Sequence, residues 1–193
     1  MPRLYYCLLL FLLTTVVAPA QSTTDSPSDY LYWSATRRLT PADFHLRLKQ
    51  DGRVQGSSGI YGFGLKGNVY DLLGKRANQA VQNRMLRSGS WLDTTDRADV
   101  RLQLQYHQTS FDISEIYARR LRQKLRSVAK NVLLWGKPSL EDVINEHLQA
   151  SQQRQVAYIE ETAYGSVPEK QAAWEQQIQQ ELRELAAYAV ADE

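Results

Sequence analysis

The sequence predicts an α+β fold in which a small antiparallel sheet is followed by three helices. Residues 54–91 are rich in Gly, Tyr, Val and Ser, a composition typical of short strands joined by turns. After Trp91 apolar residues recur at helical spacing almost to the end of the chain. Because the two kinds of segment do not alternate and no internal repeat is present, their order favours a sheet followed by helices over a parallel α/β fold.

The N-terminus has the pattern of a secretory signal peptide. One basic residue, Arg3, precedes an apolar run over residues 4–17, and small residues end the segment at Ala20. The run is short for a membrane span, so we expect residues 1–20 to be removed and the chain to be exported. Retention as an uncleaved anchor is the alternative.

Composition limits both the compartment and the partners. The one cysteine, Cys7, lies in the signal segment, so the exported chain has no disulfide, which fits a bacterial periplasm or the external medium. The formal net charge of +2 falls to +1 when Arg3 is removed, a balance that predicts neither a nucleic-acid partner nor an anionic membrane surface. Residues 21–28 are polar and Ser/Thr-rich, which predicts a flexible leader, and residues 29–193 are long enough for one domain.

Local signals place the strands of that domain. Residues 30–36 are aromatic and favour a strand, and Thr40 and Pro41 begin a turn or a single helical turn. Three further strand-like segments are expected at residues 59–65, 67–72 and 80–91.

Gly62, Gly64 and Gly67 match the spacing of a dinucleotide-binding loop. Such a loop needs a strand before it and a helix after it, and the residues that follow here are short and strand-like. We therefore interpret these glycines as a tight turn or a bulge in a curled sheet.

Capping residues and helix breakers define three helices. Their expected bounds are Asp96 (or Thr94 or Thr95) to about Lys130, Ser139 to about Thr162, and Pro168 to about Ala189. Gly136 follows the first helix and Gly165 the second. The third helix has an apolar stripe for core packing or for a partner, formed by Trp174, Ile178, Leu182, Leu185 and Ala189.

The first helix has three unusual polar residues on its apolar face. A helical projection of residues 100–128 places Tyr106, His107 and Ser110 there, where a helix presents metal ligands or a buried polar site. The opposite arc is expected to face water and holds Arg101, Gln105, Gln108, Asp112, Glu115 and Arg119. Ion pairs at helical spacing, with Arg119 or Arg122, are the expected role of Asp112 and Glu115.

A zincin protease carries His-Glu-x-x-His on its helix, where two histidines hold zinc and the glutamate acts as general base. Here that frame falls on residues 106–110, with Tyr106 and Ser110 at the histidine positions and His107 at the glutamate position. Phenol and hydroxyl groups are poor zinc ligands at neutral pH, and one histidine cannot complete a three-ligand site. We therefore expect neither bound zinc nor zincin chemistry.

Residues 106–122, YHQTSFDISEIYARRLR, resemble the core motif of a bacterial family of predicted secreted zinc-dependent proteases, long known as a domain of unknown function. Members carry His-Glu-Gln-x-His-Phe-Asp-Ile and then Glu-x-x-Ala-Arg. The matching residues are Gln108, Phe111, Asp112, Ile113, Glu115, Ala118 and Arg119. Other similar phrases are WSATRRLTPADF (33–44, with Pro41 where Trp is usual), GSSGI (56–60), SGSWL (88–92) and YIEETAYG (158–165, followed by Gln171 and Trp174).

The departures from the family pattern are concentrated at its metal site. Tyr106 and Ser110 replace the helix histidines, His107 replaces the glutamate, and Tyr164 stands where the later phrase has a histidine that would supply a third ligand. The resemblance implies a zincin-like fold, with zinc as the cofactor of the family and no cofactor in this chain.

The chain has three histidines: His45, His107 and His147. His107 and His147 lie on apolar helix faces, where a hydrogen-bonded core histidine is the commoner role. The alternative is a residual polar or metal site formed by His107, His147 and Glu161. His107 and Ser110, one turn apart, are also a candidate base and nucleophile, although no orienting carboxylate is evident.

Three functions remain open at this point. The first is an exported, non-catalytic member of the protease-like family that binds a peptide or protein in the former active-site cleft. The second is an active, metallopeptidase-like hydrolase with a rewired site, and the third is a structural or assembly protein of the cell envelope. A filled cleft around Tyr106, Ser110 and Tyr164 would disfavour binding there, whereas an open cleft lined by Trp and Tyr would favour it.

Overall fold

The computed structural model describes residues 29–48, 56–74 and 76–190. The predicted signal segment and leader therefore lie outside the described residues. The strands are β1 (Tyr30–Tyr32), β2 (Leu46–Leu48), β3 (Ser57–Leu65) and β4 (Val81–Asp93). The helices are α1 (Arg97–Trp135), α2 (Leu140–Thr162) and α3 (Pro168–Glu184), with short 3-10 helices η1 (Pro41–Asp43), η2 (Val69–Leu73), η3 (Ala77–Ala80) and η4 (Ala186–Tyr188).

The predicted α+β class, an antiparallel sheet followed by three helices, is confirmed. The long strand β4 is central: Met85 pairs antiparallel with Leu31 of β1 and with Tyr61 of β3, so these two strands lie on opposite sides of it. The short strand β2 pairs with β4 in parallel, with Arg47 opposite Leu92, and the sequence analysis did not predict that strand. A register shift between Ser58 and Ile60 marks a bulge in β3.

The predicted strand at residues 67–72 is wrong, because this stretch forms the 3-10 helix η2. The Asn68 side chain accepts a hydrogen bond from the Tyr70 amide (2.9 Å), and the Asp71 carboxylate accepts one from the Asn68 amide (2.9 Å). Such local side-chain bonds compete with strand pairing. Gly62 and Gly64 lie within β3, so these two glycines form neither a phosphate loop nor the bulge.

The helix signals place the helix ends closely. Asp96 caps α1 through the Ala98 amide (2.7 Å), and Ser139 caps α2. The first helix continues past Lys130 to Trp135 and ends at Gly136, whose φ of 64° is left-handed. The third helix ends at Glu184, earlier than predicted, and η4 follows it. No helix among the described residues is long and apolar enough to cross a membrane.

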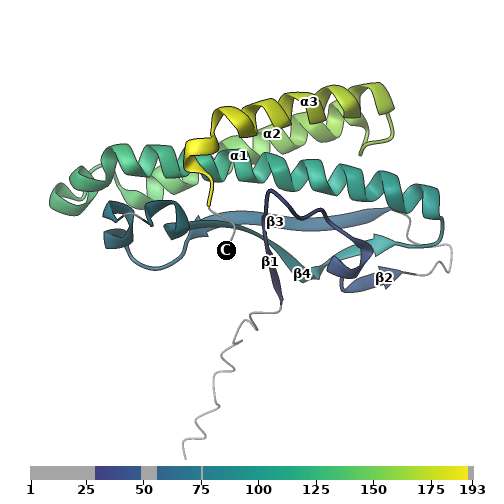
Figure 1. Cartoon of the computed structure of the whole chain (residues 1–193), viewed down its shortest axis with the longest axis horizontal. Coiled ribbons are helices and arrows are strands. Elements are labelled where there is room, and N and C mark those ends of the chain that lie inside the picture. The colour runs from purple at the N-terminus through teal and green to yellow at the C-terminus, as the bar shows by residue number, and fades with distance from the viewer. Residues whose placement is uncertain (1–28, 49–55, 75, 191–193) are drawn as a thin grey trace, which may run out of the picture.

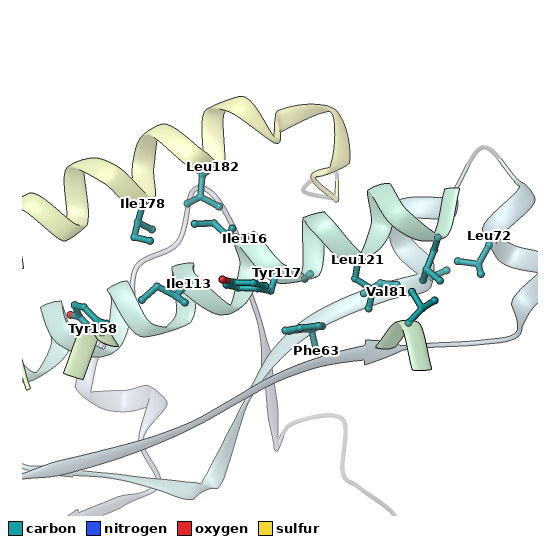
Figure 2. Packing of buried hydrophobic residues seen from close by; sticks show 14 of the residues in the cluster. Phe63, Leu72, Val81, Ile113, Ile116, Tyr117, Leu121, Tyr158, Ile178 and Leu182 are labelled. Carbon is teal, nitrogen blue, oxygen red and sulfur yellow. The ribbon is translucent and has the colours of Figure 1, made fainter. Parts of the chain in front are cut away.

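Helix α1 forms a middle layer between the sheet and the pair α2 and α3 (Figure 1). Apolar side chains pack on both of its sides. Figure 2 shows Ile178 and Leu182 of α3 directed toward Ile113 and Ile116 of α1. Trp174 of the same stripe is also buried, so its apolar residues pack in the core. Each fully buried Leu or Ile of this kind contributes about 1.5–3 kcal/mol.

The expectation that the polar arc of α1 faces water is wrong for its middle section. Asp112, Glu115 and Arg119 are only 3%, 1% and 4% exposed, and Arg122 is buried with them. The cause is tertiary: a helix covered on two opposite sides has no solvent face in its central turns. The expected ion pairs exist for Glu115, which pairs with Arg119 and Arg122 in the interior, whereas Asp112 pairs with Arg38 and not with either of these arginines.

Glu115 holds the centre of this buried polar network. Its Oε1 accepts hydrogen bonds from Arg119 Nε (3.0 Å) and Arg122 Nη1 (2.7 Å). Arg119 also donates to the Leu182 carbonyl on α3 (2.6 Å), and Arg122 donates to the Val81 carbonyl on β4 (2.9 Å). One carboxylate therefore fixes two guanidinium groups that tie α1 to both neighbouring layers.

We expect Glu115→Gln to lower the free energy of unfolding by about 3–5 kcal/mol, because it leaves two buried guanidinium groups without their counter-charge. The measurement is urea denaturation followed by circular dichroism. The matched control is Glu160→Gln at an exposed position of α2, which should change stability by less than about 0.5 kcal/mol. Equal changes in the free energy of unfolding for the two variants would contradict a stabilising role of the buried network.

Candidate functional site

The positions of the zincin frame lie on α1 opposite the turn that joins α2 to α3. Tyr106 is buried, and its ring stacks on Tyr158 of α2, with centroids 5.3 Å apart and planes at 10°. The Tyr164 ring lies 6.0 Å from the Tyr106 ring. Two positions far apart in sequence, both at predicted ligand sites, are thus neighbours in the fold.

A left-handed backbone turn brings Tyr164 to this place. Ala163, Tyr164 and Gly165 all have positive φ angles, of 47°, 59° and 80°. A Cβ on Gly165 would lie 2.9 Å from the Cβ of Tyr106, so only glycine permits this close approach. The turn leaves Tyr164 69% exposed at the surface above the buried Tyr106.

The phenol groups of Tyr106 and Tyr158 are buried. The Tyr158 hydroxyl donates to Gln171 Oε1 (2.6 Å), and burial raises the pKa of this phenol far above its ordinary value. Burial also raises the pKa of the Tyr106 phenol. Both tyrosines are therefore neutral at physiological pH and act as aromatic filling.

His107 points to the sheet side of α1. Its Nε2 lies 2.7 Å from Ser57 Oγ of β3, and its ring packs against Phe44 and Tyr61 at centroid distances of 5.2 and 6.1 Å. Burial lowers the pKa of the imidazole from 6.5 to about 4. Its Nδ1 has no hydrogen-bond partner among the described residues, so no carboxylate orients the ring.

Ser57 and His107 are close enough for a hydrogen bond of the kind that joins a nucleophile to its base. The sequence analysis did not predict this pairing. The predicted partner, Ser110, is buried, and its Oγ has no hydrogen-bond partner among the described residues. A histidine with a pKa near 4 is a weak general base, because catalysis favours a pKa near the working pH. The pair is therefore poorly suited to activate a serine.

His107, His147 and Glu161 each make a separate contact. His147 Nδ1 lies 2.8 Å from the Val143 carbonyl on its own helix, and the Glu161 carboxylate accepts a hydrogen bond from the Trp174 indole (3.0 Å). Over the described ranges no group of three or more His, Cys, Asp or Glu side chains is placed to hold a metal ion. The residual three-residue site suggested by the sequence has no support in these contacts.

The zinc that the family resemblance implies does not fit the residues present. The positions offer one imidazole, whose Nε2 already faces Ser57, together with two phenol side chains and one hydroxyl. A zinc site needs three or four deprotonated or imidazole ligands converging on one point. The donor set therefore does not match a catalytic zinc.

The space beside the frame is filled by the protein itself. The rings of Tyr106, Tyr158 and Trp174 pack in series, with Tyr158 and Trp174 centroids 5.3 Å apart. A cavity of about 310 Å³ is lined by Gln108 and Thr109, on the side of the frame away from its ligand positions, and a cavity of about 980 Å³ is lined by Trp33, Glu115 and Arg122. By the criterion of an open or a filled cleft, binding around Tyr106, Ser110 and Tyr164 is disfavoured.

The sequence analysis predicted ion pairs for Glu115 but missed their burial, and it did not predict that Glu115 and Arg122 line a cavity. Glu115, Arg119 and Arg122 stand at i, i+4 and i+7, which is the spacing of a buried helix stripe. That spacing was the available signal, but the charged residue types favoured a solvent-facing interpretation.

Comparison with known proteins finds no matching family model, no matching curated protein and no matching solved structure. The resemblance to the secreted zinc-protease family therefore remains a prediction from the quoted phrases.

We expect acid to destabilise the protein through His107. The folded pKa of about 4 lies below the ordinary 6.5, so the unfolded chain binds a proton first as the pH falls. Stability is unaffected by this group above about pH 6.5 and declines between pH 6.5 and 4, by up to about 3 kcal/mol. Urea denaturation of the wild type and of His107→Gln at pH 7, 5.5 and 4.5 measures this. Parallel pH profiles of the two proteins would contradict the prediction.

Proposed function

We propose that the chain is an exported, non-catalytic relative of zincin-like secreted proteases and that it works as a binding protein. One observation carries this proposal. The ring of Tyr164 meets the ring of Tyr106, 6.0 Å away, so two of the positions that would hold zinc in the family adjoin each other with residues that do not bind it.

The residues that match the family phrases support the proposal because they contact one another. The Trp33 indole donates to Asp112 Oδ1 (2.7 Å), and the Gln108 side chain donates to the same oxygen (2.9 Å). Tyr158 bonds to Gln171 in the same way. The matching residues thus stabilise the fold through these hydrogen bonds. The residues that differ from the family pattern lie at positions where only a bound metal would require histidine.

The arrangement of the layers also supports a zincin-like fold as a proposal. The helix with the frame lies against the sheet, and the later phrase returns to it from the turn after the next helix. A structural role in the envelope has less support, since the apolar stripe of α3 is used in the core. The rewired hydrolase is the competing function and is tested directly below.

We expect no stoichiometric zinc in the mature chain purified without chelator, and no difference in metal content between the wild type and His107→Ala. Mass spectrometry of the metal content measures both, and peptidase and esterase assays accompany it. About one zinc per chain that is lost in His107→Ala, or hydrolysis that is lost in Ser57→Ala, would establish the rewired hydrolase instead.

A reversion tests the zincin-like arrangement separately. The variant Tyr106→His/His107→Glu/Ser110→His/Tyr164→His should bind about one zinc per chain, because it restores three imidazole ligands and a base. The matched control keeps Tyr164 and should bind zinc at least about tenfold more weakly, since one ligand is missing. A folded fourfold variant without zinc would contradict the zincin-like arrangement.

A further inference from the structure

A second site lies at the other part of α1, away from the Tyr106 frame. A cavity of about 980 Å³, open to solvent, is lined by residues of β1, η2, η3, β4 and α1 and by Val190. This volume is in the range of small-molecule and peptide pockets, about 300–1,000 Å³. Its walls carry three aromatic rings, from Tyr32, Trp33 and Tyr70.

The floor of this cavity carries excess positive charge. Glu115 and Arg122 line it, and both are almost completely buried. Arg119 and Arg122 share the single carboxylate of Glu115, so two buried positive charges face one negative charge. The next carboxylate on the helix, Asp112, is bonded to other groups: the side chains of Trp33, Gln108, Gln179 and Arg38.

Two of the three guanidinium nitrogens of Arg122 donate hydrogen bonds to residues of the described ranges. Its Nε donates to the Val81 carbonyl, and its Nη1 donates to Glu115 and to the Tyr188 carbonyl (3.0 Å). Its Nη2 makes no hydrogen bond to any described residue, and the side chain lines the cavity. A buried guanidinium with a free donor is a strong partner for a carboxylate.

The rim of the cavity also carries positively charged side chains. Lys66 and Arg76 line the cavity, both are exposed, and neither forms an ion pair within the described ranges. Lys66 lies over the Tyr32 ring at 5.2 Å. Asp71 is the acidic residue of the rim. The rim and floor together attract a negatively charged ligand.

A groove continues from the cavity along the sheet face turned away from α1. It has a volume of about 400 Å³ and shares Tyr32, Lys66 and Gln82 with the cavity. Gly62 and Gly64 form part of its floor, and a Cβ at either would meet no atom within 4 Å. The groove therefore leaves room for an extended chain beside the deeper cavity.

We propose that this cavity binds the C-terminal carboxylate of a peptide. The carboxylate is held by Arg122 Nη2, and the preceding residues lie over the aromatic wall and along the groove. Arg122 Nη2 is the one free donor found on the floor among the described residues, which suits a carboxylate, whereas a phosphate presents three strong acceptor oxygens. The site is distinct from the Tyr106 frame, so its test is independent of the zinc measurements.

The test is fluorescence anisotropy with fluorescein-labelled hexapeptides ending in Phe or Leu, each as the free acid and as the C-terminal amide. The protein is the mature chain. We expect the free acids to bind at least about tenfold more tightly than the amides, which corresponds to about 1.4 kcal/mol. Replacing Arg122 risks the fold, so the variant is Lys66→Gln/Arg76→Gln, which should weaken binding of the free acids about three- to tenfold.

The matched control is Arg97→Gln/Arg101→Gln, which removes the same charge at exposed positions near the start of α1 and should leave binding unchanged. Equal binding of acids and amides, equal effects of the two double variants, or no binding at about 1 mM peptide would overturn the proposal. Asp192 and Glu193 lie two and three residues after Val190, so the titration is repeated on Asp192→Asn/Glu193→Gln, which keeps the chain length. Binding seen only in this variant would also overturn the proposal, by assigning the site to the protein's own acidic residues.

Discussion

The carboxylate of Glu115 is the constraint on which the layers of this fold depend. It accepts hydrogen bonds from Arg119 and Arg122, and these two side chains reach the Leu182 carbonyl on α3 and the Val81 carbonyl on β4. Burying three charges is costly unless each is paired and hydrogen-bonded. The arrangement is therefore tolerated only when the sheet and α3 place their carbonyl groups within reach of the two arginines. This requirement couples the position of α1 to both of its neighbours.

That position has two consequences for function. At one part of α1 the frame residues are pressed between layers, and Tyr106, Tyr158 and Trp174 fill the space with their own rings. At the other part Glu115 and Arg122 line an open cavity with Trp33. The helix that resembles an active-site helix is thus covered where the resemblance would put a metal, and it borders an open cavity where Glu115 and Arg122 lie.

Much of the secondary structure was predictable because its signals are local. Asp96 and Ser139 cap their helices, Gly136 ends α1, and the strands at β3 and β4 follow composition. The stretch at η2 was mispredicted because Asn68 and Asp71 bond to nearby amides. The parallel pairing of β2 joins distant segments, so no local pattern could indicate it.

The sequence by itself determined the order of the elements, the inward direction of Tyr106, His107 and Ser110, and the mismatch between these residues and zinc. Only the tertiary structure decided that the polar face of α1 is also buried in its central turns. A polar helix face is normally expected to face solvent, and the sequence pattern does not show how many layers pack against a helix. It also decided that Tyr164 meets Tyr106 while His147 and Glu161 make separate contacts. Such contacts depend on turns and on packing between distant segments. Hydrophobic periodicity describes each segment separately, so it does not predict these contacts.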